Sequence, residues 1–156
     1  MGFTVKVWGN KKRNPNDIDY YYGNAGFHNS LKNTSCLISL LPSTLATHNL
    51  LGLSEFKLLS KDCYFINAGR GLTVIEEELI YALKNKILNG AILDVFMEEP
   101  LDKGNLLWDL DNVYITPHIA GITQATNYAS KLLRNNFELL YKNKRLINKV
   151  SIIKGY

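Results

Sequence analysis

The sequence predicts an α/β fold, a partial doubly wound (Rossmann-like), mostly parallel sheet with flanking helices. Two observations indicate this class. Short apolar runs alternate with segments of helical spacing along the chain, which is the element order of a parallel sheet. Most of the runs lack polar alternation, as expected of strands covered on both faces. With 156 residues, 46% of them hydrophobic, the chain is long enough for one domain with an apolar core.

Each predicted strand is a short apolar run bounded by turn-forming residues. The first, FTVKVW, runs into GNKKRN, and the second, DIDYYY, is weakly apolar. CLISLL, CYFINA, GAILDVF and NVYITP follow at intervals that leave room for helices. The six predicted strands span residues 3–8, 17–22, 36–41, 63–68, 90–96 and 112–117.

Helical spacing of apolar residues predicts the elements between the strands. Three segments show it: AGFHNSLKN (25–33), LSEFKLL (53–59) and EEELIYALKNKIL (76–88). A longer helix is predicted at about 124–142. Its apolar stripe is predicted to lie against the sheet or a partner surface. The stripe comprises Ala125, Ala129, Leu132, Leu133, Phe137 and Leu140.

Cap residues predict both ends of the third helix. Thr73-Val74-Ile75-Glu76 fits a capping box, in which the threonine oxygen and the glutamate carboxylate accept hydrogen bonds from free amides at the helix start. Asn89-Gly90 fits a C-terminal stop. The helix is therefore predicted to begin directly after the loop that contains Arg70.

Bulk properties exclude several classes of protein. No run of about 18 apolar residues occurs, and MGFTVKVWGNKKRN lacks the h-region of a signal peptide, so a cytoplasmic protein without membrane segments is expected. The net charge of +4 comes from scattered positives, which indicates solvated helix faces rather than a nucleic-acid site. Cys36 and Cys63 fall in apolar runs and are predicted to be reduced core thiols, with no metal site.

Residues with chemical function follow three of the predicted strands. INAGRG ends in Arg70, AILDVFMEEP provides Asp94 and Glu99, and VYITPH ends in His118. Each alone has a structural explanation, such as an arginine that binds backbone carbonyls. Because the carboxyl ends of parallel strands share one edge, where open sheets bind ligands, we expect these residues to lie together. Such a set suits the binding and protonation of a 2-oxo acid.

The residue types predict the division of labour. Arg70 presents a planar charged fork that can bind a carboxylate at two points and polarise a carbonyl. His118 must be protonated to act as an acid, and a nearby carboxylate, Glu99, would favour the imidazolium. No side chain supplies a hydride, so a redox cofactor is required.

Several short sequence motifs indicate a resemblance to a known family. LLPST…THNLLG, INAGRG, GAILDVFMEEPL, LLWDLDNVYITPHIAG and the terminal GY occur in this order. With them the chain resembles the cofactor-domain portion of the D-isomer-specific 2-hydroxyacid dehydrogenases, and most closely the glyoxylate/hydroxypyruvate reductase A branch.

The resemblance implies roles for individual residues. The catalytic set of that family falls on Arg70, Glu99 and His118, and the substrate would be a small 2-oxo acid such as glyoxylate or hydroxypyruvate. A homodimer is implied for the full-length family member. Cofactor contacts are implied at Leu41, Pro42, Ser43, Ala68, Gly69, Asp94 near the carboxamide, and Gly121.

Two parts of the family pattern do not occur in these 156 residues. The G-x-G-x-x-G fingerprint and the strand before it are absent, and GFTVKVW resembles the second strand of such a unit. The substrate domain of the family is absent as well. Residues 1–156 are therefore expected to form an incomplete dinucleotide-binding domain, and a truncated product, a split gene and a partial sequence are all compatible with it.

The residues after the first predicted strand indicate the cofactor. NAD-binding domains usually carry an acidic residue there, which bonds the ribose hydroxyls. Here the strand ends in VWGNKKRN. With no acid and three positives, Asn10 and Lys11 are predicted to favour NADP, with NAD as the other possibility.

Two function classes remain open from the sequence. One is an NAD(P)H-dependent reductase of 2-oxo acids, of which this chain is too short a part to be expected active alone. The other is a catalytically inactive, truncated remnant that acts at most as an interaction or folding module, with exposed apolar surface.

Overall fold

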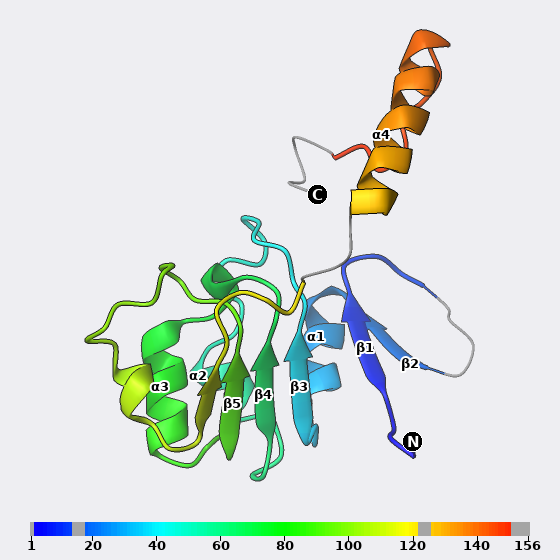
Figure 1. The fold of residues 1–156 in the computed structure, drawn as a ribbon. Helices are drawn as coiled ribbons and strands as arrows, with labels where there is room; N and C mark the ends of the chain where they lie inside the picture. The colour runs from blue at the N-terminus through cyan, green and yellow to red at the C-terminus, as the bar shows by residue number, and fades with distance from the viewer. Residues whose placement is uncertain (1, 14–17, 122–125, 151–156) are drawn as a thin grey trace.

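The computed structural model describes residues 2–13, 18–121 and 126–150. Short strands alternate with helices (Figure 1). The elements in chain order are β1 (Lys6–Gly9), β2 (Asp19–Tyr22), α1 (Gly23–Leu31), β3 (Cys36–Ser39), α2 (Leu53–Phe56), β4 (Tyr64–Asn67), η1 (Gly71–Thr73), α3 (Glu76–Lys84), β5 (Gly90–Leu93), η2 (Leu106–Asp109), β6 (Val113–Ile115) and α4 (Thr126–Tyr141).

The strands form two parallel sheets. β1 pairs with β2, and a four-stranded sheet has the order β3-β4-β5-β6. The predicted parallel α/β fold is confirmed, and each predicted strand is present in a shorter form. No backbone pairing joins β1 to β3, although β1 lies next to β3 and its arrow points the same way in Figure 1.

The two faces of the four-stranded sheet differ in what covers them. One face carries Phe65, Ala91 and Leu93, which are buried in a cluster with side chains of α1, α2 and α3. Burying a phenylalanine of this kind stabilises a fold by about 1.5–3 kcal/mol. No helix stands in front of the other face of β3, β4 and β5 in Figure 1. We call it the open face; its residues are Cys36, Ile38, Tyr64, Ile66, Ile92 and Tyr114.

Helix α1 connects the two sheets. Its Phe27 contacts Trp8 of β1, with ring centroids 4.8 Å apart. Phe27 and Leu31 also belong to the buried cluster of the four-stranded sheet. The Lys6 amino group, in β1, donates to the Lys32 carbonyl just after α1 at 2.6 Å. These contacts hold β1 and β2 beside β3 from one side only.

The predicted caps of α3 are wrong. Ile75 is the N-cap and makes no side-chain cap bond. The Thr73 hydroxyl donates instead to the Arg70 carbonyl at 2.7 Å, because η1 turns it back toward the preceding loop. The helix ends at Lys84, so Asn89-Gly90 is no helix stop, and Gly90 begins β5.

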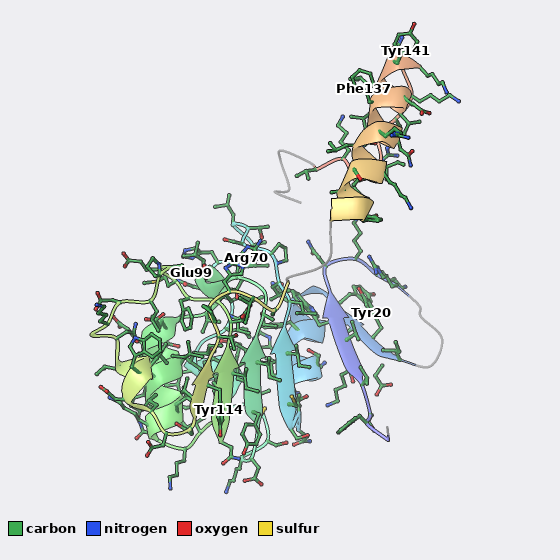
Figure 2. The ribbon with its side chains drawn as sticks, viewed as in Figure 1. Tyr20, Arg70, Glu99, Tyr114, Phe137 and Tyr141 are labelled. Carbon is green, nitrogen blue, oxygen red and sulfur yellow. The ribbon has the colours of Figure 1, made fainter. Side chains whose placement is uncertain are left out.

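The predicted packing of the last helix on the sheet is also wrong. α4 projects away from the sheet in Figure 1. Leu133, Phe137 and Leu140 of its stripe are 71%, 73% and 61% exposed, and Figure 2 shows Phe137 and Tyr141 on this projecting helix. Ala125 lies outside the described residues. The other predicted option, contact with a partner surface, stays a prediction.

The cysteine prediction holds for one thiol. Both cysteines are free. Cys63 is fully buried, and burial raises the pKa of its thiol to about 11. Cys36 is exposed, because it occupies the open face rather than the core. Within residues 2–13, 18–121 and 126–150, no helix is both long and apolar enough to cross a bilayer.

Candidate functional site

Two glycines beside Arg70 bring three loops together at the carboxyl ends of the strands. A Cβ on Gly69 would lie 2.7 Å from the backbone N and O of Leu41, and one on Gly71 would lie 1.8 Å from the carbonyl carbon of Phe96. Such separations exclude any side chain. The loop after β4 therefore lies directly against the segments that follow β3 and β5, and this explains why a charged side chain stands between two glycines.

Neighbouring polar side chains fix the backbone at Arg70. The Arg70 carbonyl accepts hydrogen bonds from the Thr73 hydroxyl at 2.7 Å and from the Asn67 amide at 3.3 Å. Asn67, 2% exposed, also accepts from the Gly69 N–H at 3.2 Å. The guanidinium itself donates to the Gly69 carbonyl at 2.7 Å. These bonds hold the guanidinium at the strand ends and leave most of its N–H donors for a ligand.

Glu99 and His118 form a direct pair. The Nδ1 atom of His118 lies 2.7 Å from one Glu99 carboxylate oxygen, while the other oxygen accepts from the Phe96 N–H at 3.0 Å. The hydrogen bond to His118 is the main cause that lowers the pKa of Glu99; partial burial opposes it, and the Phe96 N–H and the charges of His118 and Arg70 add to the lowering. Figure 2 shows Arg70 and Glu99 at the same end of the sheet.

Asp94 holds the segment that follows His118. Its carboxylate, 4% exposed, accepts from the Thr116 hydroxyl and from the backbone N–H groups of Ile119 and Ala120, both at 2.9 Å. Burial alone would raise the pKa of Asp94, but these hydrogen bonds and the nearby His118 leave it below its ordinary value. His118 has a positive φ of 54°, a conformation that histidine tolerates better than most residues. Asp94 therefore fixes the position of the loop that follows His118.

The predicted cofactor residues gather beside Arg70. An open hollow of about 350 Å³ lies between the loops after β3 and β4, near the lower end of the size range of small-molecule sites. We call it the rim hollow. It is lined by Leu40, Leu41, Pro42, Ser43, Ala68, Gly69 and Arg70.

Asn10 and Lys11 lie at the carboxyl end of β1, outside the lining of the rim hollow. The Lys11 carbonyl accepts from the Tyr20 hydroxyl at 2.7 Å. The Lys12 ammonium lies 5.9 Å from the centroid of the Tyr22 ring, a weak attraction at an exposed site. These contacts with β2 position residues 10–13, which we call the basic turn.

Other predicted residues take different places. Asp94 and Gly121 do not line the rim hollow, and Gly121 is exposed with open space around its Cα. The sequence interpretation did not single out Asn67 and Thr116, which position Arg70 and Asp94. For Asn67 the sequence did contain a signal, an asparagine at the end of an apolar run. A polar side chain that a strand buries needs hydrogen-bond partners, and these fix its neighbours. In residues 2–13, 18–121 and 126–150, no group of three or more His, Cys, Asp or Glu could hold a metal ion.

Comparison with known families and sequences gives consistent matches. The family model described as D-isomer specific 2-hydroxyacid dehydrogenase, NAD binding domain, matches residues 1–120. Glyoxylate/hydroxypyruvate reductase A of Escherichia fergusonii is 34% identical over 158 residues, which cover 99% of this chain and 49% of that protein. The protein of the same name from Photorhabdus laumondii is 33% identical over 155 residues, with the same coverage.

Solved structures show the same fold. A D-isomer specific 2-hydroxyacid dehydrogenase from Xanthobacter autotrophicus Py2, in complex with NADPH and MES, superposes with a TM-score of 0.94 at 31% identity, covering 99% of this chain and 64% of that one. An NADPH-dependent glyoxylate/hydroxypyruvate reductase from Sinorhizobium meliloti, in complex with NADP and sulfate, gives 0.92 at 32% identity, covering 99% and 50%. The chain spans about half the length of the curated relatives it matches.

Proposed function

The chain belongs to the D-isomer specific 2-hydroxyacid dehydrogenase family, and on this basis we propose that it supplies the cofactor-binding and catalytic half of a reductase of glyoxylate, hydroxypyruvate or a related 2-oxo acid. Residues 1–156 would form an incomplete dinucleotide-binding domain. The observation that carries the proposal is the Glu99–His118 pair, 2.7 Å apart, at the end of the sheet that also bears Arg70 and the rim hollow.

The cofactor of this proposal is NADPH. The related Sinorhizobium meliloti protein is described as NADPH-dependent, and the basic turn after β1 provides positive charge for a 2′-phosphate without an acidic competitor. The rim hollow has backbone-rich walls at Leu41–Ser43 and Ala68–Gly69 that suit a nucleotide. When bound, the cofactor would supply the hydride.

In the proposed reaction the protein residues orient the substrate and provide the proton. The Arg70 fork would bind the carboxylate of the 2-oxo acid and polarise its carbonyl. His118 would donate a proton to the carbonyl oxygen as a hydride reaches the carbon, which gives the 2-hydroxy acid. Glu99 would stabilise protonated His118 before the transfer, while its contact with the Phe96 N–H keeps it in place.

Assembly and location complete the proposal. The family resemblance favours a homodimer of the whole enzyme. Two free thiols suit the reducing cytoplasm, where disulfides are rare.

A covalent chimaera tests this function. The half of the Escherichia fergusonii relative that this chain does not match would be joined to residues 1–156, and NADPH oxidation measured with glyoxylate and with hydroxypyruvate. His118→Ala should lower kcat by about 10²- to 10⁴-fold, as for a lost general acid. His28→Ala, an exposed histidine of α1, is the matched control and should leave kcat unchanged.

Two further variants separate the roles. Arg70→Ala should raise KM and lower kcat together, since one group binds the carboxylate and polarises the carbonyl; Arg134→Ala on α4 controls for the lost charge. Glu99→Gln should lower kcat without abolishing activity, because a neutral amide stabilises the protonated imidazole less than a carboxylate does. An unchanged kcat would remove Glu99 from the mechanism.

The inactive interaction module is the second candidate. The open face favours it, because Ile38 and Tyr114 are 57% and 66% exposed. A chimaera that folds cooperatively and binds NADPH, yet reduces neither substrate, would decide for this candidate and against the reductase.

A further inference from the structure

Two tyrosines of β2 contact the basic turn from the neighbouring strand. The Tyr20 hydroxyl donates to the Lys11 carbonyl at 2.7 Å, and the Lys12 ammonium lies 5.9 Å from the centroid of the Tyr22 ring. Figure 2 shows Tyr20 beside β1. The residues of the basic turn are exposed. The turn is therefore held through its backbone and one side chain, while its positive charges stay accessible to a ligand.

Strand alternation directs Tyr20 and Tyr22 to the same side of β2. Successive side chains of a strand point to opposite faces. The residue between them, Tyr21, faces α1, because a Cβ on Gly26 would lie 3.4 Å from the Tyr21 Cβ. Tyr20 and Tyr22 therefore lie on the side away from α1, where Tyr20 is half-buried and Tyr22 is exposed. Substitutions at these two positions should leave the packing of α1 intact.

Gly9 gives the Tyr20 ring its path to the turn. In the register of the two strands Tyr20 lies opposite Val7, and Gly9 is two residues further along β1. A Cβ on Gly9 would lie 2.4 Å from the Tyr20 hydroxyl oxygen and 3.3 Å from the ring carbon that bears it. The ring therefore crosses β1 over the glycine, and a side chain on Gly9 would displace the hydroxyl from the Lys11 carbonyl.

The basic turn and the rim hollow lie at the same end of the strands. The turn follows the carboxyl end of β1, and the rim hollow lies between the loops after β3 and β4. β1 lies next to β3 and points the same way in Figure 1. A nucleotide in the rim hollow can therefore extend along this end of the strands toward the basic turn.

We propose that Tyr20 and Tyr22 set the cofactor preference of this chain, because they hold the basic turn in the conformation that accepts the 2′-phosphate of NADPH. This rests on the proposed function, to which it adds the residues that decide between NADPH and NADH. Neither tyrosine contacts the cofactor. Both act through the basic turn and are positioning residues, Tyr20 through its hydroxyl and Tyr22 through its ring.

The Tyr20 hydroxyl acts on the backbone of the turn. Its hydrogen bond fixes the direction of the Lys11 carbonyl. A peptide unit is planar and trans, so its C=O and N–H point in opposite directions. The N–H of Lys12 is therefore directed away from Tyr20. Backbone N–H groups of fixed direction, together with ammonium groups, are the donors that bind phosphate in proteins.

The Tyr22 ring acts on a side chain. Ordering a flexible lysine on binding costs affinity. The attraction between the Lys12 ammonium and the Tyr22 ring keeps the charge near the turn before a phosphate arrives. An ammonium group has three N–H donors, which leaves donors for the phosphate. NADH lacks the 2′-phosphate, so its affinity should depend on neither tyrosine.

Cofactor affinities of the covalent chimaera provide the direct test. Isothermal titration calorimetry would measure the Kd of NADPH and of NADH for each variant. Tyr20→Phe should weaken NADPH binding by about 3- to 10-fold, because one hydrogen bond is lost, while the Kd of NADH should change by less than about twofold. General damage to the fold would weaken both cofactors. Tyr21→Phe, on the other side of β2, is the matched control and should leave both Kd values unchanged.

The two positions should respond differently to the loss of a hydroxyl. Tyr22→Phe keeps the ring and should retain NADPH affinity, whereas Tyr22→Leu should weaken NADPH binding by about two- to fivefold. Gly9→Ala should reproduce the effect of Tyr20→Phe. The double variant of Gly9→Ala and Tyr20→Phe should lose no more than the larger single effect, because both substitutions remove the same contact.

A second measurement uses the 156-residue chain alone. Its amides would be followed by NMR during titration with 2′-AMP and with 5′-AMP, which have the same composition and charge but carry the phosphate at different ribose positions. We expect larger shifts of the amides of residues 11–13 with 2′-AMP than with 5′-AMP. Tyr20→Phe should reduce this difference. The readout needs neither turnover nor the half of the enzyme that this chain does not match.

Three results would overturn the proposal. One is a ratio of the NADPH and NADH Kd values that Tyr20→Phe and Tyr22→Leu leave unchanged. Another is an equal loss of affinity for both cofactors. The third applies even to a chimaera that binds neither cofactor, and it is the absence of any preference for 2′-AMP in the chain alone. A chimaera that shows the expected Kd ratios but reduces neither substrate would contradict the proposed reductase and support this inference.

Discussion

The buried carboxylate of Asp94 holds the loop that follows His118 in place. Three hydrogen bonds end on its carboxylate, and an asparagine at this position can accept fewer of them. We expect Asp94→Asn to lower the free energy of unfolding at pH 7 by about 1–3 kcal/mol. Urea denaturation measures the change, and Asp62→Asn, which alters an exposed carboxylate, should have no comparable effect.

The pH dependence of this effect follows from the sign of the pKa shift. The pKa of Asp94 is lower in the folded chain than the ordinary value of about 3.9. Its contribution is therefore complete above about pH 4 and is lost as the pH falls through the lower, folded pKa. The stability difference between the parent and Asp94→Asn should shrink below pH 4. A difference that stays constant from pH 7 to pH 3 would show that the Asp94 charge is not responsible.

At the level of single residues, the sequence predicted which groups meet but not how they are held. Arg70, Glu99 and His118 follow strands that were predicted correctly, and parallel strands deliver such residues to one edge. Asp94 holds the loop after His118 because the backbone N–H groups of Ile119 and Ala120 donate to its buried carboxylate. These residues are far from Asp94 in the sequence, and no local sequence pattern predicts the contact. Asp94 was predicted to contact a cofactor; that contact stays a prediction.

The loops around Arg70 behave as one packed unit, and Gly71 tests this. Its missing Cβ would overlap the Phe96 backbone at 1.8 Å, and a backbone neighbour has little freedom to move aside. We expect Gly71→Ala to destabilise the chain by about 1–3 kcal/mol or more. Thermal unfolding measures it. Gly104→Ala, whose Cβ would meet only the side chain of exposed Asp102, should be near neutral; equal losses for both would contradict the close packing.

Helix α4 contributes little to the stability of the sheet. Phe137 is 73% exposed, whereas Phe65 in β4 is fully buried. Phe137→Ala should change the free energy of unfolding by less than about 0.5 kcal/mol, while Phe65→Ala should lower it by about 3–5 kcal/mol. Chemical denaturation compares the two. A large loss for Phe137→Ala would mean that α4 packs on this chain in solution.

Element boundaries were harder to predict than element types. The strands are shorter than their apolar runs, because the run continues into loop residues such as Leu40 that face solvent at the rim hollow. The capping motif failed because the Thr73 hydroxyl has a competing acceptor in the Arg70 carbonyl. Periodicity identified the stripe of α4 but contains no information about what lies opposite.

For the whole molecule, the family resemblance and the parallel fold predicted from the sequence are confirmed. The isolated 156-residue chain should nevertheless show no measurable NADPH-dependent reduction of glyoxylate or hydroxypyruvate, since its sequence contains no glycine-rich phosphate loop. A spectrophotometric assay at 340 nm checks this. Steady NADPH oxidation that His118→Ala abolishes would contradict it.

The contrast between the two cysteines gives the molecule a ready-made attachment point for a fluorophore. Cys63 is fully buried and its thiol has a pKa of about 11, so it should resist maleimides at neutral pH. Cys36 is exposed on the open face, at the start of β3. A dye added to the unmodified chain should therefore report from one position on that face.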